Sequence, residues 1–338
     1  MARRSWIIAV LAAMVPVLFL LCLSTGSVPI PLSEVWRSLT GGMVQDPTWA
    51  TIVSQVRLPE AWTALLAGAG LAAGGLMMQT LFRNPLAGPD VLGITSGSSL
   101  GVALVMLAQP FWAAWVPQEF AVLMAAALGA FVLLGIIVGA DRRIGDGVTL
   151  LIIGLMIGYV CGAIINVLQS GSAVGALKGY VMWGMGSFAG VPPQRMAWLA
   201  MPVVLGLGAA LCMIKPLNAL LLGADHATSV GVRVRRARGI IICSTGLLAG
   251  AITAFCGPIA FLGLATPHIA RALLRTADHA RLMPATILCG AALGLLCDFL
   301  VRASGPENPL PLNAITSLLG APVVIWVLLS GKRWSHGN

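Results

Sequence analysis

The residues of this sequence that could carry out chemistry are few, and the histidines come first among them. The four are His226, His268, His279 and His336. Two of them follow an aspartate, as Asp225–His226 and Asp278–His279, but no H-E-x-x-H or similar spacing places two ligands on one helix face. We therefore interpret both pairs as solvated loop residues. The sequence therefore predicts neither a metal site nor a catalytic residue.

ATP hydrolysis by this chain is excluded by its lysines. A P-loop requires G-x-x-x-x-G-K-[ST], and Lys178, Lys215 and Lys332 all stand in other contexts. The seven cysteines lie in apolar stretches without a C-x-x-C pair, which is typical of small buried hydrophobic residues. We expect no cofactor, and any ATP dependence must come from another subunit.

The composition places the chain in a membrane. Of the 338 residues, 58% are hydrophobic and only 9% are charged, against about 25% charged in ordinary soluble domains. This apolar content suffices for about ten spans of roughly 20 residues each. We therefore predict an all-α, polytopic membrane protein with about ten transmembrane helices, and we interpret residues 1–338 as a single transmembrane domain.

Long apolar runs locate the ten expected spans. They are 6–24, 61–81, 91–108, 121–138, 148–168, 196–214, 239–255, 258–274, 282–301 and 314–329. With the N-terminus inside, fifteen of the twenty basic residues fall on inner segments, which predicts an N-in, C-in orientation. The net charge of +9 then marks the cytoplasmic face and not a nucleic-acid surface. A cleaved signal peptide is the alternative for the first run, but no A-x-A site follows it.

Two connections are too long to be simple turns. The outer segment 25–60 is expected to lie along the outer membrane surface. The inner segment 215–238 is expected to form two short helices separated by Gly223, the second capped by Asp225 and ended at Gly231. Its apolar residues would be exposed inside the cell and need a partner to cover them. A re-entrant loop on the membrane surface, without a partner, is the alternative.

Glycine and proline mark where helices approach each other and where they break. Glycines of the second and fifth spans are expected to allow close backbone contact. Those we single out are Gly68, Gly70, Gly74, Gly75, Gly154, Gly158 and Gly162. Interruptions at 85–89 and 257–267 suggest broken backbone that is buried in protein or lines a cavity.

Charge inside the spans is scarce. The exception is Asp298, which can pair with Arg302 one helical turn later. Proton- or sodium-coupled transporters need ionisable groups in the membrane. A stand-alone secondary transporter or exporter is therefore poorly supported, and an intramembrane enzyme lacks its residues.

Several motifs stand in order along nearly the whole chain. They are Arg57-Leu-Pro59, Met78-Gln79, Arg83-Asn-Pro-Leu-Ala87 with Pro89, Leu92-Gly93, the stretch 223–231, Gly257 to Gly263, Pro267-His268 with Arg271, Asp278-His279, Asp298 with Arg302, and Gly320-Ala-Pro322. This set resembles the FecCD-type permease family of ABC importers for iron-siderophores, haem and vitamin B12. The resemblance implies a type II ABC importer permease that forms a homodimer, or pairs with a paralogue, around a central path.

The resemblance also implies roles for individual residues. Two cytoplasmic ATP-binding subunits would dock on a coupling loop that includes Leu221, Leu222, Gly223, Ala227 and Gly231. A periplasmic or lipoprotein substrate-binding protein would dock outside on Arg57 and Arg302, although the family's second arginine is replaced here by Glu60. The inner gate and path would include Gln79, Asn84 and Leu86.

Each of these roles has a plainer alternative. Arg57 and Arg302 could be interfacial anchors, and Asn84 could cap a helix break. Gln79 could bond to nearby backbone, and His268 with Arg271 could bind carbonyl groups or lipid phosphates.

The expected function is ATP-driven import of a metal chelate across the bacterial inner membrane by alternating access. An iron–siderophore chelate is the substrate we expect first, and haem or vitamin B12 is the alternative. The chain itself is expected to be no enzyme, to be surrounded by membrane lipid and to bind no nucleic acid.

Overall fold

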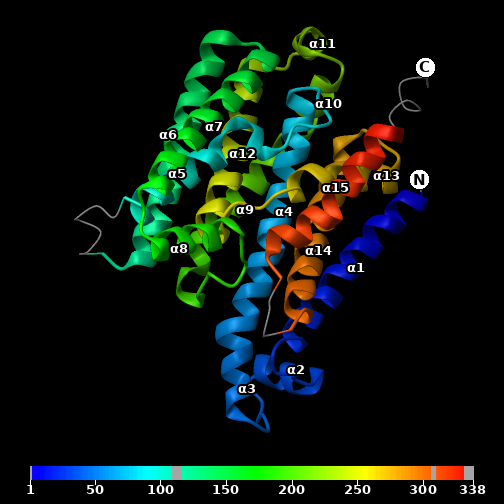
Figure 1. Ribbon diagram of the computed structural model, residues 1–338. Helices are drawn as coiled ribbons and strands as arrows, with labels where there is room; N and C mark the ends of the chain where they lie inside the picture. Colours follow the sequence, from blue (N-terminus) through cyan, green and yellow to red (C-terminus); the bar gives the residue numbers. More distant parts are fainter. Residues whose placement is uncertain (1, 109–115, 306–309, 331–338) are drawn as a thin grey trace.

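The computed structural model describes residues 2–108, 116–305 and 310–330 (Figure 1). Regular structure within these ranges is entirely helical. The α-helices are α1 (Ala2–Ser24), α2 (Leu32–Thr40), α3 (Pro47–Ile52), α4 (Leu58–Leu81), α5 (Ile94–Met106), α6 (Gln118–Ile144), α7 (Gly147–Ser170), α8 (Val174–Gly184), α9 (Met196–Cys212), α10 (Ile214–Leu221), α11 (Ala224–Ser229), α12 (Val234–Cys256), α13 (Leu262–Leu274), α14 (His279–Ala303) and α15 (Leu312–Ser330). The short turns are η1 (Val53–Arg57), η2 (Pro89–Leu92) and η4 (Pro193–Arg195).

Seven helical segments of the described ranges are long and apolar enough to cross a membrane. They are Trp6–Ser24, Pro47–Leu81, Gln118–Ile144, Gly147–Ser170, Pro193–Cys212, Val234–Cys256 and His279–Ala303. The other three expected spans correspond to the shorter helices α5, α13 and α15. The all-α, polytopic fold is therefore confirmed, and the count of ten crossings stays a prediction. With 13 residues each, α5 and α13 are only about 20 Å long, less than the roughly 30 Å hydrocarbon core.

The beginning of the first helix and the end of the last described helix lie on the same side of the helical bundle. The beginning of α1 and the end of α15 point toward the half of the molecule that carries α10 and α11, and α2 and α3 lie at the opposite end (Figure 1). We name these the inner end, with α10 and α11, and the outer end, with α2 and α3. The assignment follows the excess of basic residues on the inner side.

Helix α4 forms the centre of the bundle. In its membrane-spanning segment, 83% of the apolar window is buried inside the protein, compared with 17% for α1 and for α7. It packs against α9, α12, α13 and α14. The less buried helices, such as α1 and α7, face outward, where lipid can cover their apolar side chains.

Glycines let α4 approach its neighbours at backbone distance. A Cβ atom at Gly68 would lie 2.1 Å from the carbonyl oxygen of Gly290 on α14, so no larger residue fits there. The predicted close contacts of Gly68 and Gly154 are confirmed. The prediction was wrong for Gly162, because a Cβ atom added to this residue would meet no other atom within 4 Å.

A second close contact depends on the proline inside α13. Pro267 has no N–H to offer Gly263, four residues earlier, and the Gly263 oxygen lies 1.8 Å from the position of a Cβ atom at Gly75 on α4. Only a glycine hydrogen fits against that oxygen, as in the C–H···O contacts of tightly packed helices. Of the predicted break at 257–267, residues 257–261 are non-helical, with Phe261 at a φ of 63°, and residues 262–267 already belong to α13.

The second span begins earlier than expected. Helical structure starts at Pro47, not at residue 61, and runs without interruption through Leu81. Its 35 residues extend over about 50 Å, so α3 projects at the outer end (Figure 1). The motif at Pro59 lies inside this continuous helix. The π-turn η1 accommodates the proline, with the Leu58 N–H donating to the Val53 carbonyl. The outer connection is correspondingly shorter than 25–60 and contains α2.

Substitution of Gly68 tests the central packing. We expect Gly68→Ala to lower the melting temperature of the purified protein, at a cost of about 1–3 kcal/mol, because the methyl group collides with backbone that cannot rotate away. Gly162→Ala is the matched control, since its methyl group enters open space. Equal melting temperatures for the two variants would contradict the assigned contact.

Candidate functional site

The inner segment 215–238 forms the two short helices that its sequence predicts. Helix α10 buries Leu217 and Leu220 against the bundle, whereas Leu222 is 68% exposed and Val230 is 58% exposed. Exposed aliphatic side chains on a polar end of a membrane protein favour a surface that a partner covers. We call residues 214–231, which contain α10 and α11, the coupling segment.

The turns of the coupling segment depend on two glycines. Gly223 joins α10 to α11 at a φ of 109°, and Gly231 follows α11 at a φ of 85°. These values lie in the region that residues with a Cβ atom rarely adopt. The expected N-cap of the second short helix, Asp225, was wrong by two residues. Gly223 occupies the N-cap position, and Asp225 lies inside the first turn of α11. Ala227 is fully buried, and its carbonyl accepts the Val232 N–H at 2.9 Å.

The loop that follows α4 contains the residues assigned to the inner gate. We call residues 82–88 the gate loop. The Asn84 side-chain oxygen accepts the Leu86 N–H at 2.9 Å, so it stabilises the turn of the loop itself, and the Leu86 side chain is 43% exposed. Gln79, in the last turn of α4, donates to the Leu264 carbonyl at 3.1 Å. The contacts of Asn84 and Gln79 thus match the plainer interpretations, in which Asn84 stabilises a turn and Gln79 bonds to backbone. Their roles in a gate stay predictions.

Helix α13 is fastened to the same region by two polar side chains. His268 Nε2 lies 2.7 Å from the Pro85 carbonyl oxygen, and Arg271 Nη1 donates to Gln79 Oε1 at 2.6 Å. The prediction that His268 binds a carbonyl group is confirmed. These contacts connect α4, the gate loop and α13 into one polar cluster at the inner end.

His279, at the inner end, differs from the solvated loop residue that was expected. Its side chain is fully buried, not solvated, and lies between Asn218 of α10 and Thr80 of α4. Asp278, its neighbour, is exposed and caps α14 by accepting the Ala280 N–H at 3.0 Å. That hydrogen bond, with one from Asn218, holds the pKa of the Asp278 carboxyl below its ordinary value. The cap therefore stabilises the fold fully above the ordinary aspartate pKa and is lost as the pH falls through the lowered one.

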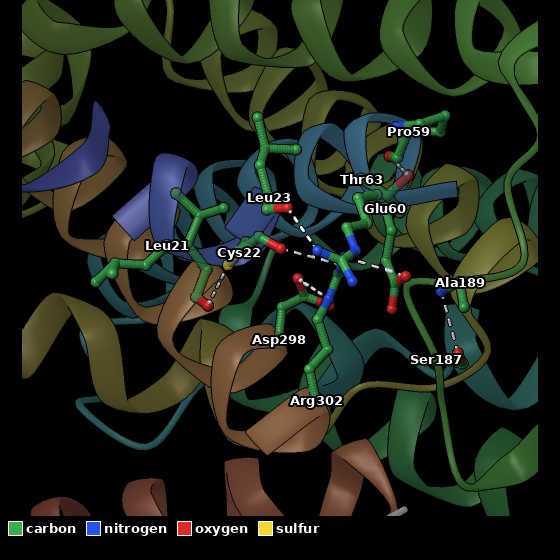
Figure 2. Close-up of polar contacts among 12 residues, drawn as sticks. Leu21, Cys22, Leu23, Pro59, Glu60, Thr63, Ser187, Ala189, Asp298 and Arg302 are labelled. Carbon is green, nitrogen blue, oxygen red and sulfur yellow. Dashed lines mark hydrogen bonds and ion pairs between the residues drawn. The ribbon is translucent and has the colours of Figure 1, made fainter. Parts of the chain in front are cut away.

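The outer end holds a buried cluster of charges, drawn in Figure 2. Arg302 Nε lies 3.0 Å from Asp298 Oδ2, its Nη2 lies 3.0 Å from Glu60 Oε2, and its Nη1 donates to the Cys22 carbonyl at 3.1 Å. The expected pair of Asp298 and Arg302 is confirmed. The contribution of Glu60 was missed, because its distance from Arg302 in sequence gives no local signal. The cluster joins the ends of α1 and α14 to the outer part of α4.

Arg57 is also turned inward. Its side chain is 3% exposed, and its guanidinium donates to the carbonyls of Leu23, at 2.8 Å, and Val28. These bonds hold the connection that follows α1. The docking role expected for Arg57 and Arg302 stays a prediction, since both guanidinium groups are engaged inside this chain.

The described residues offer little for catalysis. Nowhere in ranges 2–108, 116–305 and 310–330 do three or more His, Cys, Asp or Glu side chains gather as a metal site would require. The polar side chains described above instead connect helices at the two ends of the bundle. Such an arrangement suits a protein that changes the relative position of its helices.

Comparisons with known proteins agree with this architecture. The model of the FecCD transport family matches residues 14–330. The vitamin B12 import system permease protein BtuC of Shigella boydii serotype 18 is 36% identical over 304 residues, covering 89% of this chain and 90% of its own. BtuC of Escherichia coli O9:H4 is 35% identical over 326 residues, covering 93% and 96%.

A solved structure extends the likeness to three dimensions. It shows an inward-facing conformation of what is described as a metal-chelate type ABC transporter, with a TM-score of 0.84 and 29% identity, covering 97% of this chain and 99% of that one. The shared helices therefore have the same arrangement over nearly their whole length.

Removal of the central arginine tests the outer charge cluster. We expect Arg302→Met to destabilise the protein by about 3–5 kcal/mol, because Glu60 and Asp298 would remain buried without a counter-charge. Neutralising both acids in the same variant, with Glu60→Gln and Asp298→Asn, should restore much of the lost melting temperature.

The matched control is Arg37→Met. Arg37 also pairs with a carboxylate, Glu34, at 2.7 Å, but its side chain is 51% exposed, so its loss should cost only about 0–1 kcal/mol. Similar losses for both arginines would refute the structural role assigned to Arg302.

Proposed function

Because this chain belongs to the FecCD transport family, we propose that it forms the membrane path of an importer for a cobalt corrinoid such as vitamin B12. The family's members are permeases of ABC importers, polytopic proteins of the bacterial inner membrane, and not enzymes. The identity of the substrate is inferred from the individual relatives within the family. Similarity to BtuC over most of both chains favours vitamin B12 over the iron chelate expected first.

The coupling segment is the observation that carries the proposed mechanism. Leu222 and Val230 are exposed on paired short helices at the inner end, and the chain has no P-loop of its own. Two cytoplasmic ATP-binding subunits would cover these residues. Their nucleotide cycle would then favour one arrangement of the helices over another by several kcal/mol, which is what alternating access requires.

The other partners follow from the same family. A substrate-binding protein would deliver the corrinoid at the outer end, and a second copy of the chain would complete the path. A metal chelate as substrate also agrees with the description of the solved relative.

Uptake into proteoliposomes tests the proposal. The chain is reconstituted with its ATP-binding subunits and binding protein and given cyanocobalamin, a ferric siderophore or haem in separate assays. We expect ATP-dependent uptake of cyanocobalamin alone. Uptake of the ferric siderophore alone would overturn the substrate, and uptake that an uncoupler abolishes without any need for ATP would overturn the importer mechanism.

Substitution of Gly231 tests the coupling segment. We expect Gly231→Asp to abolish uptake and the stimulation of ATP hydrolysis while the protein still inserts, because a Cβ atom is strained at a φ of 85° and the charge meets the docking surface. Gly145→Asp is the matched control: this inner-end glycine also has a positive φ, of 68°, but ends α6. Normal uptake by the Gly231 variant would remove the coupling role from this segment.

A further inference from the structure

A chain of hydrogen bonds, partly exposed at Asn218 and buried at Thr80, leaves the coupling segment and reaches the central helix. It begins at Asn218, on α10. The Asn218 Nδ2 donates to Asp278 Oδ1 at 2.8 Å, and its Oδ1 accepts the backbone N–H of His279, also at 2.8 Å. The first turn of α14 is thus capped in part by a side chain from the coupling segment, in addition to its own Asp278.

The imidazole of His279 continues the chain. Its Nδ1 lies 2.9 Å from the same Asn218 oxygen, and its Nε2 lies 2.8 Å from the hydroxyl of Thr80. Since the amide oxygen can only accept, Nδ1 must carry the ring proton, and in the neutral ring Nε2 is an acceptor. The single proton of the Thr80 hydroxyl is therefore shared between Nε2 and the Leu76 carbonyl, which lies 2.9 Å from Thr80 Oγ1. His279 and Thr80 are 0% and 2% exposed, so water cannot replace either bond at low cost.

Thr80 is one of two residues of α4 whose carbonyl groups hold the first turn of the gate loop. Its carbonyl accepts the Arg83 N–H at 3.2 Å, and the carbonyl of Gln79 accepts the Asn84 N–H at 3.1 Å. A displacement of Thr80 therefore moves the first turn of the gate loop directly.

We propose that Asn218, His279 and Thr80 form a relay that transmits movement of the coupling segment to the gate loop. The relay rests on the proposed function, since it needs ATP-binding subunits that move the coupling segment. All three are positioning residues, because they act through the gate loop and do not face substrate. Contiguous hydrogen bonds between three helices provide the physical connection that such transmission requires.

Replacement of the Thr80 hydroxyl tests the relay in the complete reconstituted complex. We expect Thr80→Val, which keeps the shape of the side chain, to lower the number of substrate molecules transported per ATP hydrolysed by about tenfold. Thr80→Ser keeps the hydroxyl and should restore the wild-type ratio.

The matched control is Thr63→Val on the same helix. Thr63 is equally buried, and its hydroxyl donates to the Pro59 carbonyl within α4. Its loss should leave the ratio of transport to hydrolysis unchanged. A purely structural role for Thr80 would lower the amount of complex, its hydrolysis and its transport together, without changing the ratio, and that result would overturn the relay.

Asn218→Ala provides a second variant at the other end of the relay. We expect it to lower the same ratio, and its combination with Thr80→Val to add little, because both interrupt one chain. Full additivity of the two effects would overturn the relay. Failure of the wild-type complex to couple uptake to ATP would instead refute the proposed function, so the two hypotheses fail separately.

Discussion

The close backbone contact of α4 with α13 and α14 is the constraint on which the other parts of the structure depend. At Gly68 and Gly75 the neighbouring carbonyl oxygens occupy the space where a side chain would begin. In a membrane, lipid tails solvate apolar side chains as well as protein does, so association of helices relies on such tight packing. The contact holds α4 inside the bundle and brings its two ends within reach of polar partners.

Because α4 is one uninterrupted helix with α3 and η1, it connects the two polar regions mechanically. Glu60 meets Arg302 near its outer end, and Thr80 meets His279 near its inner end. The outer cluster ties α1, α4 and α14 together by charge, which makes that end rigid. At the inner end, the contact between Thr80 and His279 is a single hydrogen bond between neutral groups, which costs less to rearrange than a buried ion pair. The contact of α4 with α14 is therefore easier to rearrange at Thr80 than at Glu60.

The sequence predicted those features that depend on local pattern. Apolar runs located the spans, the basic residues gave the orientation, and the spacing of leucines and glycines predicted the paired helices of the coupling segment. Contacts between distant residues were not predictable, because nothing in the sequence near His279 or Glu60 indicates which helix faces it. The π-turn before Pro59 was missed for a related reason: the usual preference of proline for helix starts was overridden by an adjustment of the turn. Helix α8, which contains no fully buried residue, was also missed.

The outer cluster has a consequence for the substitutions that this sequence tolerates. Glu60 is one of two acids that share Arg302. An arginine at position 60 would face Arg302 with Asp298 as the lone acid of the cluster. A change of charge at any one of positions 60, 298 and 302 therefore requires a compensating change at another, so the three residues behave as a single unit of charge.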